Sequence, residues 1–161
     1  MRVAVAVDHA GHPLKEAVLS VLAGEGHEVI DCGTDSDQSV DYPLHAGRAA
    51  ELVSSGEAQL AVLACGTGAG VSIVANKYPG VRAVNARDRE DAEMSRRHND
   101  ANALALAGRR LGPDDARAIV KTFLETEFEG GRHGRRVDQI GRIENEQRLG
   151  MPKPEHAESA T

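Results

Sequence analysis

The sequence lacks most of the features that mark membrane proteins, secreted proteins and zinc-binding proteins. Its only cysteines, Cys32 and Cys65, form no C-x-x-C pair, so neither a disulfide framework nor a zinc site is expected. No apolar run approaches the ~20 residues of a membrane-spanning helix. The opening stretch MRVAVAVDHAG is too short, and charged too early, for a signal peptide. We therefore expect a soluble, cytoplasmic protein with reduced thiols.

An excess of positive charge is also missing. The chain has 19 Lys and Arg against 25 Asp and Glu, a formal net charge of -6 at pH 7. That balance argues against a nucleic acid or an anionic membrane as the partner of the whole protein, and leaves only a local basic cluster to bind a small anion. At 161 residues the chain fits one domain, which we place at 1–149. A chain of this length buries roughly 70% of the surface that its unfolded form exposes.

Three common cofactor and metal motifs are absent as well. The dinucleotide fingerprint G-x-G-x-x-G fits Gly66 and Gly68 but fails at Val71, and its loop would follow the third strand instead of the first. Neither the nucleotide P-loop nor the zinc motif H-E-x-x-H occurs. His9 and His12 stand at a strand-to-helix junction, which favours one site histidine and one surface histidine over two metal ligands. We therefore expect neither a metal nor a cofactor.

What the sequence has instead is an alternation of strand and helix patterns. Short apolar runs, each typical of a strand covered on both faces, occupy residues 2–7, 28–33, 59–66, 81–86 and 102–108. Segments of helical period lie between them, and the first carries an apolar stripe of Leu14, Ala17, Val18, Val21 and Leu22 before Gly24 and Gly26. The pattern predicts a three-layer, Rossmann-like α/β fold with a doubly wound sheet of about five parallel strands.

The C-terminal segment departs from this pattern. Val137, Ile140 and Ile143 recur at helical spacing, but no strand follows them. We expect residues 134–149 to form a helical arm that packs on another subunit, and residues 150–161 to form a mobile tail.

Polar residues gather where the predicted strands end. In open α/β sheets, ligands bind beyond the carboxyl ends of the strands. That edge receives Asp8 and His9 from the first strand, Cys65 from the third and Arg109 from the fifth. The segment RRHND, which contains His98 and Asn99, lies just before the fifth strand. The sequence therefore predicts a ligand site at the carboxyl edge of the sheet.

The loop that follows Cys65 is the strongest of these signals. Gly66, Gly68 and Gly70 allow successive amide groups to approach an anion or a developing oxyanion, and a helix-like stretch comes next. A thiol at the start of such a helix favours its thiolate form and can act as a base. A second interpretation stays open, in which Cys65 is a small buried hydrophobe and the glycines merely turn the chain.

The remaining candidates are weaker. The basic cluster Arg132, His133, Arg135 and Arg136 is a solvated helix start, an ion-paired surface or a clamp for a phosphate group. Cys32 is expected to be a packed thiol at a strand end. His27, His45 and His156 have no patterned neighbours, and we expect them on the surface or in loops.

Seven motifs, in order along the chain, carry a resemblance to a known family: VDHAGHPLK, DCGT, DYP, CGTGAGVSIVANK, VRAV, RRHNDANALALAGR and EGGRHGRRV. The chain resembles the sugar-phosphate isomerases that include type B ribose-5-phosphate isomerase and the galactose-6-phosphate isomerase subunits. This resemblance implies an aldose–ketose isomerase of the pentose phosphate pathway that works through a cis-enediolate, without metal or cofactor, on ribose 5-phosphate. Two alternatives stay open: another sugar phosphate (allose 6-phosphate, galactose 6-phosphate or a tetrose phosphate), or a module that binds a phosphometabolite without converting it.

The resemblance also implies a role for individual residues. Cys65 becomes the base, Thr67 a hydroxyl near the reacting oxygens and His98 the acid that opens the furanose ring. Relatives without the cysteine use a glutamate six positions later, where this chain has Val71. A homodimer with shared active sites, or a homotetramer, is implied, with the C-terminal arginines contributed across the interface. The implied substrate-binding residues are Asp8, His9, Gly66, Thr67, Gly68, Ala69, Gly70, Asn99, Arg109, Arg132 and Arg136.

Overall fold

A five-stranded parallel sheet forms the centre of the protein, whose computed structural model describes residues 1–150. The strand order is β2-β1-β3-β5-β4, with every neighbouring pair parallel. Each strand lies within one of the apolar runs of the sequence, so the predicted parallel sheet is confirmed. The strands are β1 (Arg2–Val7), β2 (Glu28–Asp31), β3 (Leu60–Cys65), β4 (Ala83–Asn85) and β5 (Ala103–Ala107).

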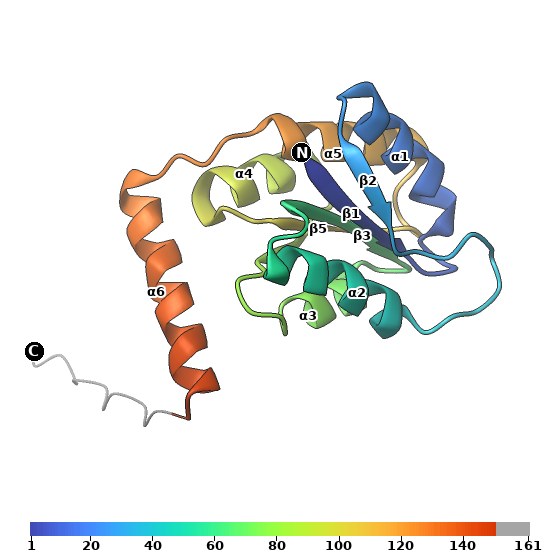
Figure 1. Cartoon of the computed structure of the whole chain (residues 1–161). Helices are drawn as coiled ribbons and strands as arrows, with labels where there is room; N and C mark the ends of the chain where they lie inside the picture. The colour runs from blue at the N-terminus through green and yellow to red at the C-terminus, as the bar shows by residue number, and fades with distance from the viewer. Residues whose placement is uncertain (151–161) are drawn as a thin grey trace, which may run out of the picture.

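Helices cover both faces of this sheet (Figure 1). One apolar cluster joins the sheet to α1 (Lys15–Gly24), α4 (Arg89–Asn99) and α5 (Pro113–Glu125). A second cluster joins the other face to α2 (Tyr42–Ser55) and α3 (Ala69–Ala75). Right-handed crossovers between parallel strands place helices on both sides, which gives the three layers that the alternating pattern predicts.

The first crossover shows how the sequence determines this packing. A short 3-10 turn (His12–Leu14) leads into α1, and Leu14, Val18 and Leu22 are all buried against the sheet. The helix ends at Gly24, and Gly26 adopts a left-handed conformation with φ of 73° before the chain returns to β2. The predicted apolar stripe is therefore the face of α1 that contacts the core.

The structure also places Cys32, His27 and His45. Cys32 is buried just after β2, as predicted, and that burial raises the pKa of its thiol. His45 is not a loop residue: it lies in α2, and its Nδ1 is 2.7 Å from the carbonyl oxygen of Cys32. His27 is half-buried before β2, whereas His156 lies outside the described residues.

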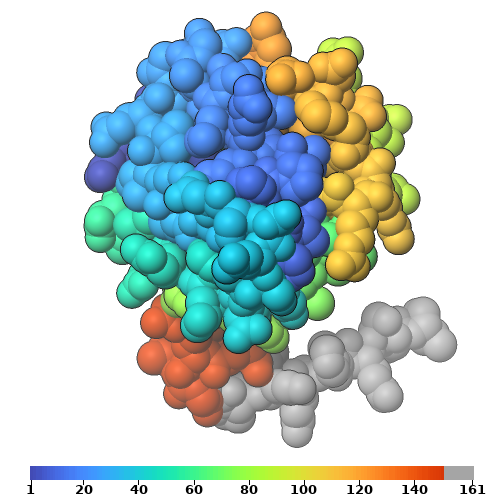
Figure 2. Space-filling view, turned by 90° about the vertical axis from the view of Figure 1, so that its right-hand side faces the viewer, coloured from blue at the N-terminus to red at the C-terminus, as the bar shows by residue number. Residues whose placement is uncertain are grey.

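The C-terminal arm is a helix, α6 (Gly131–Arg148), which starts three residues earlier than predicted. In Figure 1 it stands on the side of the sheet from which β1 starts, and Figure 2 shows it protruding from the body. It contacts α4 near its start, and Glu144 accepts a hydrogen bond from the amide of Gly80 at 2.9 Å. Ile140 and Ile143 on α6 are exposed.

The described chain ends just beyond α6. Apart from Gly150, the predicted tail at 150–161 lies outside the described residues. Within residues 1–150, every helix is either too short or too polar to cross a membrane.

Candidate active site

A pocket of about 260 Å³ lies at the carboxyl ends of β1, β3 and β5. The prediction that polar residues meet at this edge of the sheet is confirmed for the residues that follow these strands. The pocket is lined by Asp8, His9, Ala10, Tyr42, Cys65, Gly66, Thr67, Gly70 and Arg109. We call this group, together with Gly68 and Ala69 of the same loop, the thiol half of the site.

The loop after β3 wraps closely around its neighbours. Gly68 has φ of 75°, and a Cβ at this position would lie 2.3 Å from Oδ1 of Asn85, so only glycine fits. The side-chain amide of Asn85 donates a hydrogen bond to the carbonyl oxygen of Thr67 at 3.0 Å. Within the described part of the chain, the amides of Gly66, Thr67 and Gly68 have no hydrogen-bond acceptor. Such a run of free amides can stabilise an anion.

The thiol of Cys65 and the guanidinium of Arg109 are held at adjacent strand ends. The amide of Gly108 donates to the carbonyl oxygen of Cys65 at 2.8 Å, and that of Arg109 donates to Gly66 at 3.1 Å. Gly66 has no Cβ, and the guanidinium carbon of Arg109 lies 3.3 Å from the position a Cβ would take. A permanent positive charge therefore lies over the glycine loop, and Cys65 itself is only 4% exposed.

Backbone amides orient both residues that follow β1. Oδ1 of Asp8 accepts hydrogen bonds from the amides of Ala10 at 2.9 Å and Gly11 at 2.8 Å, which leaves Oδ2 available to a ligand. Nδ1 of His9 accepts a hydrogen bond from the amide of Val40 at 3.2 Å. The neutral ring of His9 therefore carries its proton on Nε2, as a donor.

The other predicted residues do not join this pocket. His98 and Asn99 end α4 and precede β5, so they lie at the amino edge of the sheet. The five residues of β5 span about 13 Å, with His98 before the start of the strand and Cys65 beside its end. Within one chain, His98 and Cys65 therefore lie far apart. Arg132 and Arg136 lie in the first turns of α6, beside α4. We call His98, Asn99, Arg132 and Arg136 the histidine half of the predicted site.

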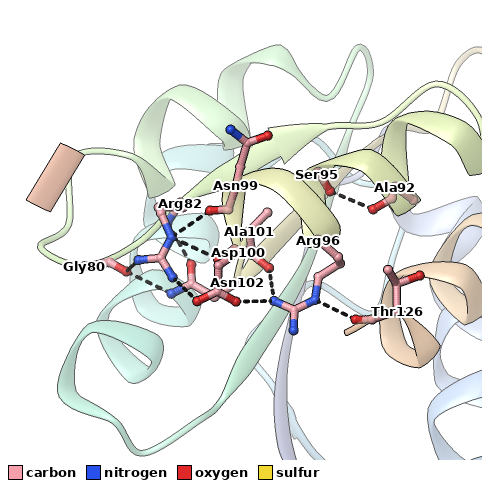
Figure 3. A network of polar contacts seen from close by, with 10 residues as sticks. All are labelled: Gly80, Arg82, Ala92, Ser95, Arg96, Asn99, Asp100, Ala101, Asn102 and Thr126. Atoms are coloured by element: carbon pink, nitrogen blue, oxygen red, sulfur yellow. Dashed lines mark hydrogen bonds and ion pairs between the residues drawn. The ribbon is translucent and has the colours of Figure 1, made fainter. Parts of the chain in front are cut away.

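A polar network fixes the turn that carries His98 and Asn99 (Figure 3). Asp100 caps α4 in a left-handed conformation with φ of 46°. Its two carboxylate oxygens pair with Arg82 and Arg96, both at 3.0 Å. Arg82 also donates from Nε to the carbonyl oxygens of Asn99 and Asp100. The turn is therefore held by charge-assisted hydrogen bonds from two directions.

Replacing Asp100 with alanine is expected to destabilise the protein. Asp100→Ala removes both ion pairs and puts alanine, which tolerates the left-handed conformation less well than aspartate, at φ of 46°; together these should lower the free energy of unfolding by about 2–3 kcal/mol. Urea denaturation measures this loss. Asp100→Asn, which tolerates the left-handed conformation, should lose less. Equal losses in the two variants would show that the backbone conformation contributes nothing.

The histidine half has neighbours that the sequence prediction did not include as site residues. The rings of His98 and His133 are stacked, with centroids 4.3 Å apart and planes 7° apart. Oε2 of Glu129 lies 3.6 Å from Nε2 of His98 and 3.5 Å from Nε2 of His133. Within the basic cluster, His133 is therefore buried beside Glu129, while Arg132 and Arg136 remain exposed.

One residue of the thiol half, and one that contacts its loop, were not predicted as site residues. Tyr42, the first residue of α2, lines the pocket, and its ring lies 2.7 Å from where a Cβ of Gly70 would be. Asn85 contacts the loop from the end of β4. The motif DYP contains Tyr42, but only the folded chain shows that α2 begins over the glycine loop.

Comparison with known proteins adds to this geometry. Residues 3–140 match the family model described as ribose/galactose isomerase. The chain is 44% identical over 143 residues to ribose-5-phosphate isomerase B of Escherichia coli, covering 89% of this chain and 96% of that protein. A Clostridium thermocellum ribose-5-phosphate isomerase B structure superimposes with a TM-score of 0.88 at 48% identity, covering 91% of this chain and 99% of the other.

A further structure combines this fold with a bound sugar phosphate. Ribose-5-phosphate isomerase B of Mycoplasma genitalium, solved with ribulose 5-phosphate, has a TM-score of 0.86 at 38% identity and covers 90% of this chain and 97% of its own. Together with the family match and the sulfur-containing pocket, these similarities show that the chain belongs to the ribose/galactose isomerase family and is a sugar-phosphate isomerase.

Proposed function

We propose that the protein interconverts ribose 5-phosphate and ribulose 5-phosphate, with Cys65 as the base. The observation that carries this proposal is the placement of a buried thiol beside free loop amides and Arg109. A carbon acid needs a base at one carbon and stabilisation of negative charge on the neighbouring oxygen, and this loop supplies both.

The proton transfers follow from this arrangement. The Cys65 thiolate takes the proton from C2 of the open-chain aldose, and the electron pair forms the enediolate. The amides of residues 66–70 stabilise its oxygens, and Thr67 lies within the same loop as a hydroxyl for proton exchange between O1 and O2. Return of the proton to C1 gives the ketose. Val71 is buried in α3 and offers no alternative base.

The substrate site is completed, in this proposal, by a second copy of the chain. Within one chain the thiol half and the histidine half lie at opposite edges of the sheet. In a homodimer, His98, Asn99, Arg132 and Arg136 of one subunit reach the thiol half of the other. His9 and Arg109 then hold the phosphate from one subunit and the two C-terminal arginines from the other. The exposed Ile140 and Ile143 support α6 as part of this interface.

Substrate preference tests the proposed function. Purified protein treated with a chelator is assayed on ribose 5-phosphate, allose 6-phosphate, galactose 6-phosphate and erythrose 4-phosphate. We expect the highest kcat/KM for ribose 5-phosphate. A higher value for another sugar would replace the substrate but keep the chemistry. Binding of ribose 5-phosphate without turnover of any of the four would contradict an isomerase.

A further inference from the structure

Glu129 is held in a fixed position next to His98. Its amide donates to the carbonyl oxygen of Arg97 at 3.1 Å, and its Oε1 accepts a hydrogen bond from Nη2 of Arg97 at 2.7 Å. Arg97 precedes His98 in α4, so the backbone and the side chain of one residue both anchor the glutamate. This leaves Oε2 for the two histidines, and the hydrogen bond from Arg97 lowers the pKa of Glu129.

The hydrogen-bond donors around the stacked rings determine which histidine carries a proton toward Glu129. Nε of Arg132 donates to Nε2 of His133 at 3.4 Å, so that nitrogen holds a lone pair and His133 is neutral. Burial, followed by the charges of His98 and Arg132, lowers the pKa of His133. Of the two imidazole nitrogens near Oε2 of Glu129, Nε2 of His98, at 3.6 Å, is therefore the one free to carry a proton.

From this geometry we propose that Glu129 is a positioning residue for His98: it holds the Nε2–H tautomer, so that Nδ1 is the atom that acts on the sugar ring. The proposal rests on the proposed function. In ring opening, Nδ1 takes the proton of the O1 hydroxyl, the C1–O4 bond breaks, and the imidazolium returns the proton to O4. Glu129 stabilises that imidazolium against the positive charges of Arg97, Arg132 and Arg136. The stacked ring of His133 fixes the plane of His98.

A divalent cation is the other ligand that this cluster suggests, because the ligand atoms of His98, Glu129 and His133 lie within 4.8 Å of one another. A metal ion binds an imidazole in the plane of the ring. Since the two rings are parallel within 7°, a cation between their Nε2 atoms would lie out of both planes. The stacked geometry therefore favours a glutamate that positions His98 over a metal site.

Glu129→Gln tests the proposal through the tautomer of His98. Arg97 should bind the amide oxygen of the glutamine, which turns its NH2 group toward Nε2 of His98. The ring must then accept at Nε2, and its proton moves to Nδ1. We expect the imidazole 15N chemical shifts of His98 to change from the Nε2–H to the Nδ1–H pattern. Glu127→Gln, which alters a nearby exposed carboxylate, should leave the Nε2–H pattern in place.

Kinetics provide the second measurement. Glu129→Gln should lower kcat/KM for ribose 5-phosphate about 10–100-fold, and Glu129→Asp should recover part of it. Solvent-hydrogen exchange at C1 of ribulose 5-phosphate should stay near the wild-type rate, because a ketose phosphorylated at O5 has no ring to open. An unchanged tautomer, or equal loss in both assays, would overturn the proposal. Absence of isomerase activity in the wild type would instead reject the proposed function. The 15N pattern would still test whether Glu129 holds the tautomer of His98.

Discussion

Cys65→Ala should lower kcat for isomerisation of ribose 5-phosphate by about 10²–10⁴-fold, the usual contribution of a general base. The same variant should stop solvent-hydrogen exchange at C1 of ribulose 5-phosphate, because both reactions need a base at the reacting carbons. Cys65 is buried at the end of β3, and alanine fits its space without a clash, so the fold should persist. Proton NMR in heavy water measures the exchange directly.

Cys32→Ala is the matched control. Cys32 is also buried, at 5% exposure, and follows the end of β2, which β1 separates from β3 in the sheet. Its thiol packs in the core beside α2 and does not line the pocket of Cys65. Activity within about twofold of the wild type is expected for this variant. If Cys32→Ala lost activity as strongly as Cys65→Ala, the loss would reflect general packing and not the base.

His98→Ala should divide the reaction into its two stages. We expect kcat/KM for ribose 5-phosphate to fall about 10²-fold, because the furanose must open before C2 can lose its proton. Exchange at C1 of ribulose 5-phosphate should continue, since this substrate is already acyclic. Erythrose 4-phosphate, whose phosphorylated O4 cannot close a furanose ring, should also be spared if the wild type accepts it.

The control for this variant is His27→Ala, which removes a half-buried imidazole in the turn before β2. It should leave both assays unchanged. Loss of C1 exchange in His98→Ala, to the same degree as isomerisation, would show that His98 acts at the carbon centre and not at the ring.

The layers of the fold could be predicted from the sequence because apolar patterning is local. The buried stripe of α1 and the continuous apolar runs of β1, β3 and β5 report directly which faces are covered. The same reasoning located Asp8, Cys65 and Arg109, because residues that follow parallel strands necessarily meet at one edge.

The rest of the site depends on contacts that spacing along the chain does not contain. His98 lies close to Arg109 in sequence, yet β5 runs between them and places them at opposite edges. Glu129 and His133 meet His98 only because α6 packs beside α4. The polar network around Asp100 likewise joins residues from Gly80 to Thr126, so the turn that presents Asn99 is a tertiary feature.

The division of the site between two subunits is tested most directly by mixing Cys65→Ala with His98→Ala. After co-refolding in equal amounts, half of the dimers should be mixed, and each mixed dimer combines an intact thiol half with an intact histidine half at one of its two sites. Isomerisation of ribose 5-phosphate should therefore return to about one quarter of the wild-type rate, although each variant alone is nearly inactive. A mixture no more active than the separate variants would show that one chain supplies the whole site.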